Sequence, residues 1–388
     1  MSDTELLSKL RRFETFLQVD PANQRLITDL VNLYVQTGDV GAAIACLRRP
    51  EVSSLNSSKI QLRLADLLIG EKQWQEAQQI YQELSGQGVD SPDFRFAFGL
   101  TLFYQNQFAN ALDQWLLAIR QGMNQADLWK YCAYSHHHLF QMKEAIDACL
   151  RWAEISENSP ESLNYLCLLY FDANDMTEAS IIATGLLNKD AQSLIGHTVM
   201  GSVALENHRP EIAYSHFSQA VVHTKDTGRA WLGLGLSHLY LQQHSDAVLA
   251  LKRAEIELPN HSGTVIALAW VLLMTNQLTD AEARFRNAIE IDRNFAEGHG
   301  GLASVLVHLG RIDEAKSSMS IASKLDTQCF GVVYAKAALL QREGRSEAAE
   351  SLFKRTLERT TRHQDKSMMD HLQAFLTQSS KSNKSNRN

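Results

Sequence analysis

The sequence has little proline, glycine and cysteine. Its 388 residues include only 6 prolines and 20 glycines, too few for the many tight turns of an all-β sandwich. Alanine, leucine, glutamine and glutamate are abundant instead, which favours helices. Five widely spaced cysteines without a CxxC pair argue against a disulfide framework or a zinc site, and they are typical of small buried side chains in a reducing, cytoplasmic setting. They are Cys46, Cys132, Cys149, Cys167 and Cys329.

An excess of positive charge and long hydrophobic runs are also missing. The 37 Lys and Arg residues are outnumbered by 44 Asp and Glu residues, and the net charge is -7. This balance argues against a nucleic-acid partner. Apolar stretches end well short of the roughly 20 residues that cross a bilayer, so we expect no membrane insertion. Met1 to Glu5 carry acidic residues where an export signal carries basic ones, so we expect no such signal.

A strict internal repeat dominates what the sequence does contain. Alanine recurs ten times at a constant interval of 34 residues, without insertions. A run of this kind does not arise by chance and indicates a repeated structural unit. The ten alanines are Ala43, Ala77, Ala111, Ala145, Ala179, Ala213, Ala247, Ala281, Ala315 and Ala349.

Other columns align when this alanine is numbered 20 in a repeat that first begins at Gln24. Position 8 is small in nine repeats, and position 24 is mostly large, as in Trp115 and Phe285. Positions 7, 8 and 11 share one helical face, and positions 20, 24 and 27 share another. Each repeat is therefore predicted to be two amphipathic helices. Their small residues allow close approach, and glycine pairs such as Gly300 and Gly301 are interpreted as close-packing sites.

This pattern resembles the tetratricopeptide repeat family. The 34-residue period, the small residue at position 8, Ala at 20, an aromatic at 24 and Ala at 27 carry the resemblance, together with Trp129, Trp231 and Pro259. It implies an all-α fold, a right-handed α-solenoid or superhelix of stacked helix-turn-helix repeats. Residues 24–363 would form ten repeats: 24–57, 58–91, 92–125, 126–159, 160–193, 194–227, 228–261, 262–295, 296–329 and 330–363.

The two ends of the array are expected to differ from its interior. Residues 1–23 are predicted to be an N-terminal capping helix, with Phe13 at the place of position 24. Residues 364–378 are predicted to be a C-terminal capping helix, and residues 379–388 a disordered polar tail. Within the first repeat, Pro50 is expected to end the second helix early.

No catalytic, metal or cofactor site is expected. His136, His137 and His138 are consecutive, so on a helix their rings point about 100° apart and cannot converge on one ion. The sequence lacks the HExxH, GxSxG and phosphate-loop motifs. We therefore expect a protein that is not an enzyme, with the histidines used in packing or in lining a groove.

The resemblance also implies where a partner binds. In that family, partners commonly lie along the concave face, lined by positions 2, 5, 6, 9, 12 and 13 of the first helices. Aromatic side chains at these positions suit a peptide with apolar anchors, although packing against a neighbouring repeat is an alternative for each of them. The candidate partner-binding residues are Phe96, Phe103, Tyr104, Lys130, Tyr131, Tyr134, His137, His138, Tyr165, Phe171, Tyr240 and Trp270.

Three functions fit these observations. The first is a non-catalytic protein–protein interaction scaffold or adaptor that holds a segment of a partner protein. The second is a dedicated chaperone or peptide-sensing receptor. The third is an accessory subunit of an enzyme complex. The sequence leaves the identity of the partner and the oligomeric state open.

Overall fold

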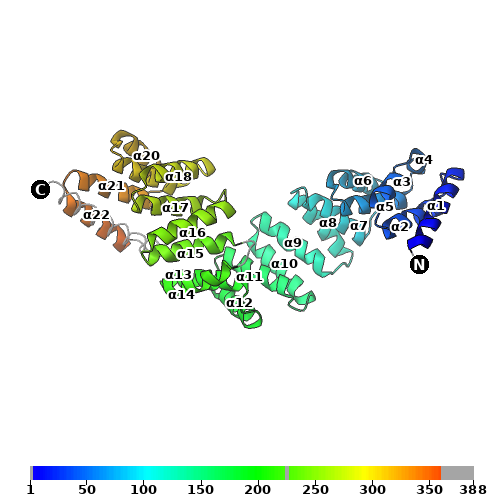
Figure 1. Cartoon of the computed structure of the whole chain (residues 1–388), viewed down its shortest axis with the longest axis horizontal. Coiled ribbons are helices and arrows are strands. Elements are labelled where there is room, and N and C mark those ends of the chain that lie inside the picture. The colour runs from blue at the N-terminus through cyan, green and yellow to red at the C-terminus, as the bar shows by residue number, and fades with distance from the viewer. Residues whose placement is uncertain (1–2, 223–226, 360–388) are drawn as a thin grey trace. The chain divides into compact units, whose positions relative to one another are not determined.

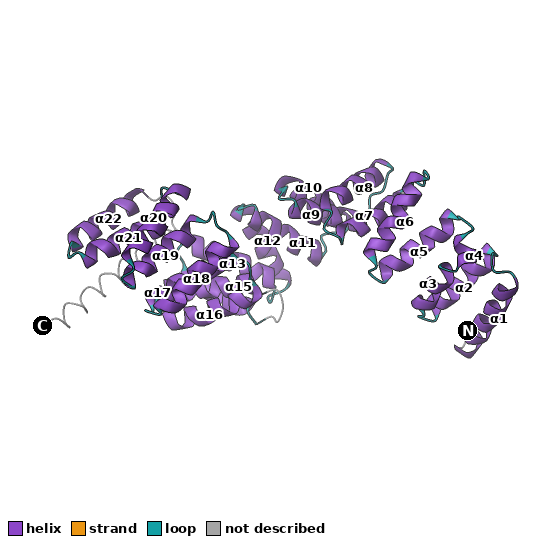
Figure 2. Ribbon diagram, turned by 90° about the horizontal axis from the view of Figure 1, so that it is seen from above, coloured by secondary structure: helices purple, strands orange, loops and turns teal. Residues whose placement is uncertain are grey.

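The computed structural model describes residues 3–222 and 227–359, and every regular element in these ranges is a helix (Figure 1, Figure 2). The expected all-α class of stacked helix pairs is therefore confirmed. The predicted C-terminal capping helix and tail lie outside the described residues. The described residues form two compact halves that divide between Leu169 and Tyr170, within the helix α11 (Pro160–Asp172).

The N-terminal half consists of a single helix followed by helix pairs. Its helices are α1 (Asp3–Val19), α2 (Gln24–Gln36), α3 (Val40–Leu47), α4 (Pro50–Ser53), α5 (Ser58–Gly70), α6 (Trp74–Gly86), α7 (Pro92–Phe103), α8 (Phe108–Arg120), α9 (Ala126–His138), α10 (Met142–Ile155) and the first part of α11 (Pro160–Asp172).

The C-terminal half continues with the same alternation. Its helices after α11 are α12 (Met176–Lys189), α13 (Leu194–Glu206), α14 (Pro210–Ala220), α15 (Gly228–Tyr240), α16 (His244–Glu257), α17 (Ser262–Met274), α18 (Leu278–Ile291), α19 (Ala296–His308), α20 (Ile312–Leu325), α21 (Phe330–Arg342) and α22 (Ser346–Arg359).

The alanine column is the contact point of each helix pair. All ten alanines are buried, none with more than 1% of its surface exposed. The large residue at position 24 fills the space beside it: Trp115, Phe217 and Phe285 are among the largest fully buried side chains. At Gly99 an added Cβ would lie 2.1 Å from the Trp115 indole nitrogen. A small residue at position 8 is thus required where the residue at position 24 is largest.

The turn inside each pair has one fixed conformation. Position 15 has a positive φ in all ten repeats, from 55° at His208 to 79° at Gly310 and Gly344. The next residue donates its backbone N–H to the carbonyl of position 11, as from Gln107 to Leu102 at 3.0 Å. This is the left-handed helix ending that favours glycine or asparagine. Lys72 and Phe140 occupy it without that advantage, so their backbones are strained.

The first repeat shows two local adjustments. The α1 helix packs on α2 and buries Leu17, with Phe13 against the same core cluster. The second helix of the first repeat, α3, ends at Leu47, and Pro50 begins the separate short helix α4. Proline fits the first position of a helix because no backbone N–H is needed there. The early helix end expected at Pro50 is therefore present.

Near the C-terminal end, α21 packs unusually close to an earlier first helix. A Cβ on Gly331 would lie 2.4 Å from the backbone carbonyl carbon of Gly300, so the two helices touch through their main chains. The Ser304 hydroxyl donates to the Gly331 carbonyl at 3.1 Å. Residues Phe330 and Tyr334 of α21 reach the indole of Trp270 on α17. As a result, α17 is buried continuously from Thr264 to Met274.

Candidate partner-binding surface

Ten rings gather on the N-terminal half and are named here the aromatic surface. They come from α7 and the residue that follows it, from α9 and α11, and from the starts of the second helices α6 and α8. Their ring centroids form one continuous chain of contacts. The residues are Trp74, Phe96, Phe103, Tyr104, Phe108, Tyr131, Tyr134, His137, His138 and Tyr165.

One end of the aromatic surface is a stacked pair. The Trp74 and Tyr104 rings are 4.2 Å apart and nearly parallel, at 13°. Tyr104 retains 45% of its surface exposed, and its hydroxyl lies 3.1 Å from the hydroxyl of Tyr131. Stacked pairs of this kind contribute roughly 0.5–1.5 kcal/mol beyond their burial. The pair therefore holds an accessible tyrosine in a fixed orientation.

A second stacked pair follows one repeat later. Phe108 and His138 are 4.3 Å apart with an angle of 4° between their planes. Burial lowers the pKa of His138, with a smaller contribution from the neighbouring His137, so the imidazole is neutral at neutral pH. Phe140, at the strained turn directly after α9, is 85% exposed. A neutral, largely apolar edge results.

The tyrosines at the centre of the aromatic surface keep their hydroxyl groups protonated, so they carry no charge. Burial raises the pKa of Tyr134 to about 12, with Glu161 adding to the shift, and burial raises that of Tyr131 further, assisted by its bond to Tyr104. The Tyr165 hydroxyl is 2.8 Å from Nδ1 of His137. These hydroxyls can exchange hydrogen bonds with a ligand but do not ionise near neutral pH.

Lys130 is the one Lys or Arg among the candidate partner-binding residues, and its side chain lies against the aromatic surface. Its Nζ lies 5.4 Å from the Trp152 ring and 5.9 Å from the Tyr134 ring, and it pairs with a Glu161 oxygen at 2.5 Å. The lysine is thus held by two aromatic faces and one carboxylate. These contacts fix the lysine against the Tyr134 and Trp152 rings and so help to hold both rings in place.

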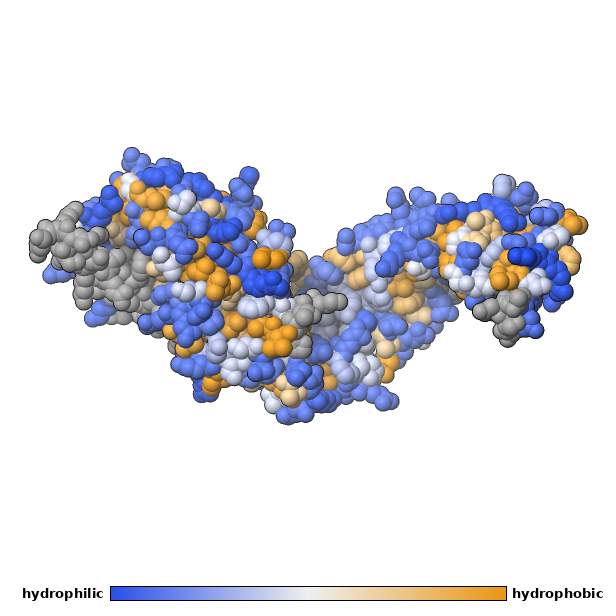
Figure 3. All heavy atoms as spheres, in the orientation of Figure 1, coloured by the Kyte–Doolittle hydropathy of each residue, from blue (hydrophilic) through white to orange (hydrophobic). Residues whose placement is uncertain are grey.

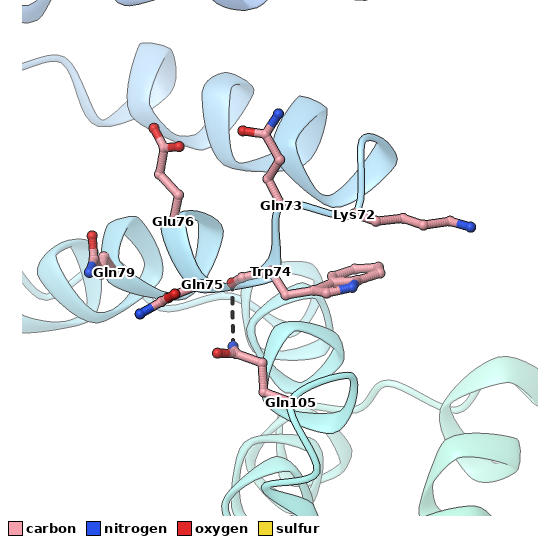
Figure 4. Close-up of a pocket in the computed structure, with 7 residues that line it drawn as sticks. All are labelled: Lys72, Gln73, Trp74, Gln75, Glu76, Gln79 and Gln105. Atoms are coloured by element: carbon pink, nitrogen blue, oxygen red, sulfur yellow. Dashed lines mark hydrogen bonds between the residues drawn. The ribbon is translucent and has the colours of Figure 1, made fainter.

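A shallow hollow of about 690 Å³ adjoins the first stacked pair (Figure 4). It is lined by side chains from the α5–α6 turn, from α6 and from the residues after α7: Lys72, Gln73, Trp74, Gln75, Glu76, Gln79 and Gln105. The Gln105 amide is occupied, because it donates to the Gln78 side chain and to the Thr101 carbonyl. Glu76 is paired with Arg48 at 2.6 Å. The hollow is therefore amide-rich and open to solvent.

The structure brings together nine of the twelve residues expected to bind a partner, and these nine all lie in the N-terminal half. Phe171 lies in the other half, where the Arg229 guanidinium covers its ring at 5.9 Å. Tyr240 is half-buried beside the core around Phe217. The assignment of Trp270 is corrected: it is 3% exposed and packs among Phe285, Phe330 and Tyr334.

Sequence reasoning missed Trp74 and Phe108. Both begin a second helix at position 17 and are one repeat apart, outside the first-helix positions that were considered. Their partners Tyr104 and His138 occupy position 13 of the following repeats. Reading columns 17 and 13 together would have found the two stacked pairs.

In the C-terminal half the rings around Trp270 form a second cluster, and there Trp270, Phe330 and Tyr334 are buried. On the face drawn in Figure 3, most residues are hydrophilic and the hydrophobic ones form separate patches. Among the described residues, no group of three or more His, Cys, Asp or Glu side chains could hold a metal ion. Within the same ranges, none of the helices is both long and apolar enough to cross a membrane.

Comparison with known proteins gives one match to a family model and several distant relatives. The family model Tetratricopeptide repeat matches residues 198–262. The human Protein O-mannosyl-transferase TMTC3 is 23% identical over 261 residues, and the match covers 64% of this chain but only 28% of that protein. The chain thus corresponds to less than a third of this relative.

Two solved structures are also similar. YrrB, described as a TPR protein with an unusual peptide-binding site, is 18% identical and covers 50% of this chain and 99% of its own, with a TM-score of 0.40. Yeast Tom70 is 15% identical and covers 97% of this chain and 93% of its own, with a TM-score of 0.42.

The matched segment and the repeat geometry agree with each other. Residues 198–262 span most of repeats six and seven, and the other repeats show the same buried alanine and the same left-handed turn. Residues 198–262 are thus similar to tetratricopeptide repeats, and the other described repeats share their geometry.

Proposed function

We propose that this chain is a non-catalytic scaffold or adaptor that binds a segment of another protein on its aromatic surface. One observation carries the proposal: Tyr104, His138 and Phe140 are exposed while their rings or backbones are held rigidly. Rigid aromatic side chains supply contact area at a small entropic cost, which is typical of binding hot spots. The proposal extends to a cytoplasmic location, supported by five buried free thiols, and to a protein rather than a nucleic-acid partner.

Affinity capture from the native cell lysate tests this proposal. The natural chain is compared with a Tyr104→Ala, His138→Ala, Phe140→Ala variant whose helical circular dichroism must match. A Leu249→Ala, Ile256→Ala variant is the control, because these side chains of α16 are 68% and 70% exposed in the C-terminal half. We expect the aromatic variant to lose a partner that the control retains. Equal retention by all three chains would refute binding at this surface.

A second candidate is an accessory or targeting array for an enzyme. It is favoured by the similarity of 64% of this chain to a part of a mannosyltransferase. A dedicated chaperone or peptide-sensing receptor has no specific support beyond the shared surface. The capture experiment separates the first two, since an accessory array should co-purify with an enzyme whose activity changes when the array is removed.

A further inference from the structure

The two stacked pairs repeat with the array. Trp74 and Phe108 both occupy position 17, and Tyr104 and His138 both occupy position 13. Both pairs are nearly parallel and have almost equal separations, 4.2 and 4.3 Å. The pairs are therefore two copies of one feature, at the edge where the helices of neighbouring repeats turn.

The spacing of the two pairs is set by Phe103. Its ring lies 5.4 Å from Tyr104 in the first pair and 5.4 Å from Phe108 in the second. The two rings are therefore no more than about 11 Å apart. A ligand that contacts both pairs must present apolar groups on one side that are separated by a similar distance.

A polyproline II helix has such a spacing. It has three residues per turn and rises about 3.1 Å per residue, so every third side chain recurs after about 9 Å on the same side. Proline rings pack on flat aromatic faces, and this conformation loses little entropy on binding because it is already formed in the free peptide. A strand and an α-helix can also place side chains on one side within this limit, at about 6.7 Å and 5.4 Å. The polyproline II helix differs from both in its proline-rich backbone, which offers carbonyls and few N–H groups.

The hydrogen-bonding groups beside the first pair match such a ligand. A polyproline II backbone makes no internal hydrogen bonds, and each proline supplies a carbonyl but no N–H. It therefore needs donors from its partner. The Trp74 indole N–H has no hydrogen-bond partner within the described part of the chain, and Gln75 and Gln79 line the adjacent hollow with exposed amides.

A cation that forms no ion pair with described residues lies at this end. Glu76 is neutralised by Arg48 at 2.6 Å, whereas Lys72 forms no ion pair with any described residue. Figure 4 shows the Lys72 side chain extending from the α5–α6 turn in the same direction as the Trp74 indole. An acidic side chain on a ligand seated at Trp74 would therefore be attracted.

We propose that the two stacked pairs bind a proline-rich segment in the polyproline II conformation, with prolines three residues apart and an acidic residue beside the proline at Trp74. This inference rests on the proposed function, since it specifies the partner of the same surface. The first proline packs on the Trp74–Tyr104 pair and the next one on the Phe108–His138 pair.

Fluorescence anisotropy with synthetic peptides and the full chain tests the inference. The probe is a fluorescein-labelled peptide with proline at every third residue, alanine and glutamine between, and one glutamate before the first proline. A peptide of the same composition with proline at every fourth residue controls for spacing. We expect the first peptide to bind at least about tenfold more tightly than the second, since only one contains the matching repeat.

Protein variants locate the site. Trp74→Ala should weaken binding of the first peptide about tenfold or more, the effect of removing a tryptophan hot spot. Tyr214→Ala, which removes a 41% exposed tyrosine in the other half, should leave it unchanged. Lys72→Glu should weaken the glutamate peptide but not a version with glutamine in its place. Phe108→Leu, which keeps an apolar side chain, should weaken binding without unfolding the helix pair.

The outcomes separate this inference from the proposed function. Failure of the first peptide to bind, or equal binding of the two spacings, would overturn the inference. So would unchanged affinity in Trp74→Ala. If the lysate capture still yields a partner that requires Tyr104 and His138 while the peptide fails, the scaffold proposal stands and the partner is not proline-rich. If the peptide binds and Lys72→Glu has no selective effect, the acidic contact is refuted.

Discussion

The helices α9 and α17 are both first helices of their repeats, yet their surroundings differ. On α9 only Leu128, Cys132, Ala133 and Ser135 are buried, and its aromatic residues are partly exposed. On α17 eleven consecutive residues are buried, because α21 approaches through Gly331 and places Phe330 and Tyr334 on Trp270. The same repeat can therefore offer a surface or become core, depending on whether a later helix reaches it.

The largest predicted effect contrasts two tryptophans. Trp270→Ala should lower the free energy of unfolding of the C-terminal half by about 3–5 kcal/mol, since it leaves a cavity in the core. Trp74→Ala should lower that of the N-terminal half by less, roughly 1–2 kcal/mol, since the indole is only partly buried and loses mainly its stacked pair. Hydrogen exchange of α17 and α6 measures each half separately, as a multi-part array is not two-state. Equal losses in the two halves would contradict the contrast.

A smaller effect is predicted at the backbone contact itself. Gly331→Ala forces α21 away from Gly300 and should destabilise the C-terminal half by about 1–3 kcal/mol. Gly185→Ala in α12 is the matched control, because a Cβ there meets nothing within 4 Å. It should stabilise the same half by roughly 0.5–1 kcal/mol through the better helix propensity of alanine. Hydrogen exchange of α21 and α12 measures both changes. A destabilising effect of Gly185→Ala would contradict the argument from the space around each glycine.

Acid is predicted to affect the C-terminal half more than the N-terminal half. Burial lowers the pKa of His216, His261 and His308 in the former, but only of His138 in the latter. Because the unfolded chain then binds more protons, stability is complete above about pH 6.5 and falls as the pH drops below it.

Hydrogen exchange at pH 7.5 and pH 5 measures this difference. Opening of the C-terminal half should become easier at pH 5, and His308→Gln should weaken the dependence. His308 Nε2 lies 3.1 Å from the Tyr334 hydroxyl, a contact that glutamine can replace. A pH dependence confined to the N-terminal half would contradict this prediction.

The smallest effects are predicted for exposed ion pairs. Glu161→Gln breaks the pair with Lys130, and Asp172→Asn weakens the pair with Arg229, which is 2.6 Å long. Each pair has one partner about half exposed or more, so each loss should be about 0.2–1 kcal/mol and should shrink in high salt. Hydrogen exchange of α9 and α15 at low and high salt measures both losses. A loss well above this range in either half would point to a contact beyond the ion pair.

The repeat, the helix pairs and their close contacts could be predicted from the sequence because they depend on residues within one repeat. Ala at position 20 faces position 8 of the same helix pair. The residue types at these two aligned positions therefore indicate directly how closely the two helices pack. Gly235 illustrates this, since an added Cβ would lie 2.6 Å from the Leu251 side chain of the same repeat. The buried cysteines were also predicted correctly.

The fate of Trp270 could not be predicted in this way, because the residues that bury it lie two repeats later. One indication was present: position 7 is apolar in nine repeats but is Lys336 in the last. In the structure Lys336 is exposed, and Phe330, Tyr334 and Ala335 face inward instead. The helix α21 therefore turns a different face to the core. The break at position 7, Lys336, was thus a sign in the sequence that this helix packs differently and covers Trp270.

The five buried thiols have a consequence for how this molecule can be followed. Burial raises the pKa of Cys132, Cys149, Cys167 and Cys329 to about 12 and also raises that of Cys46, so almost no reactive thiolate exists while the helices are closed. An alkylating reagent can modify each sulfur only after its own helix opens. The native sequence therefore contains five local reporters of opening, and labelling rates would reveal the order in which its repeats come apart.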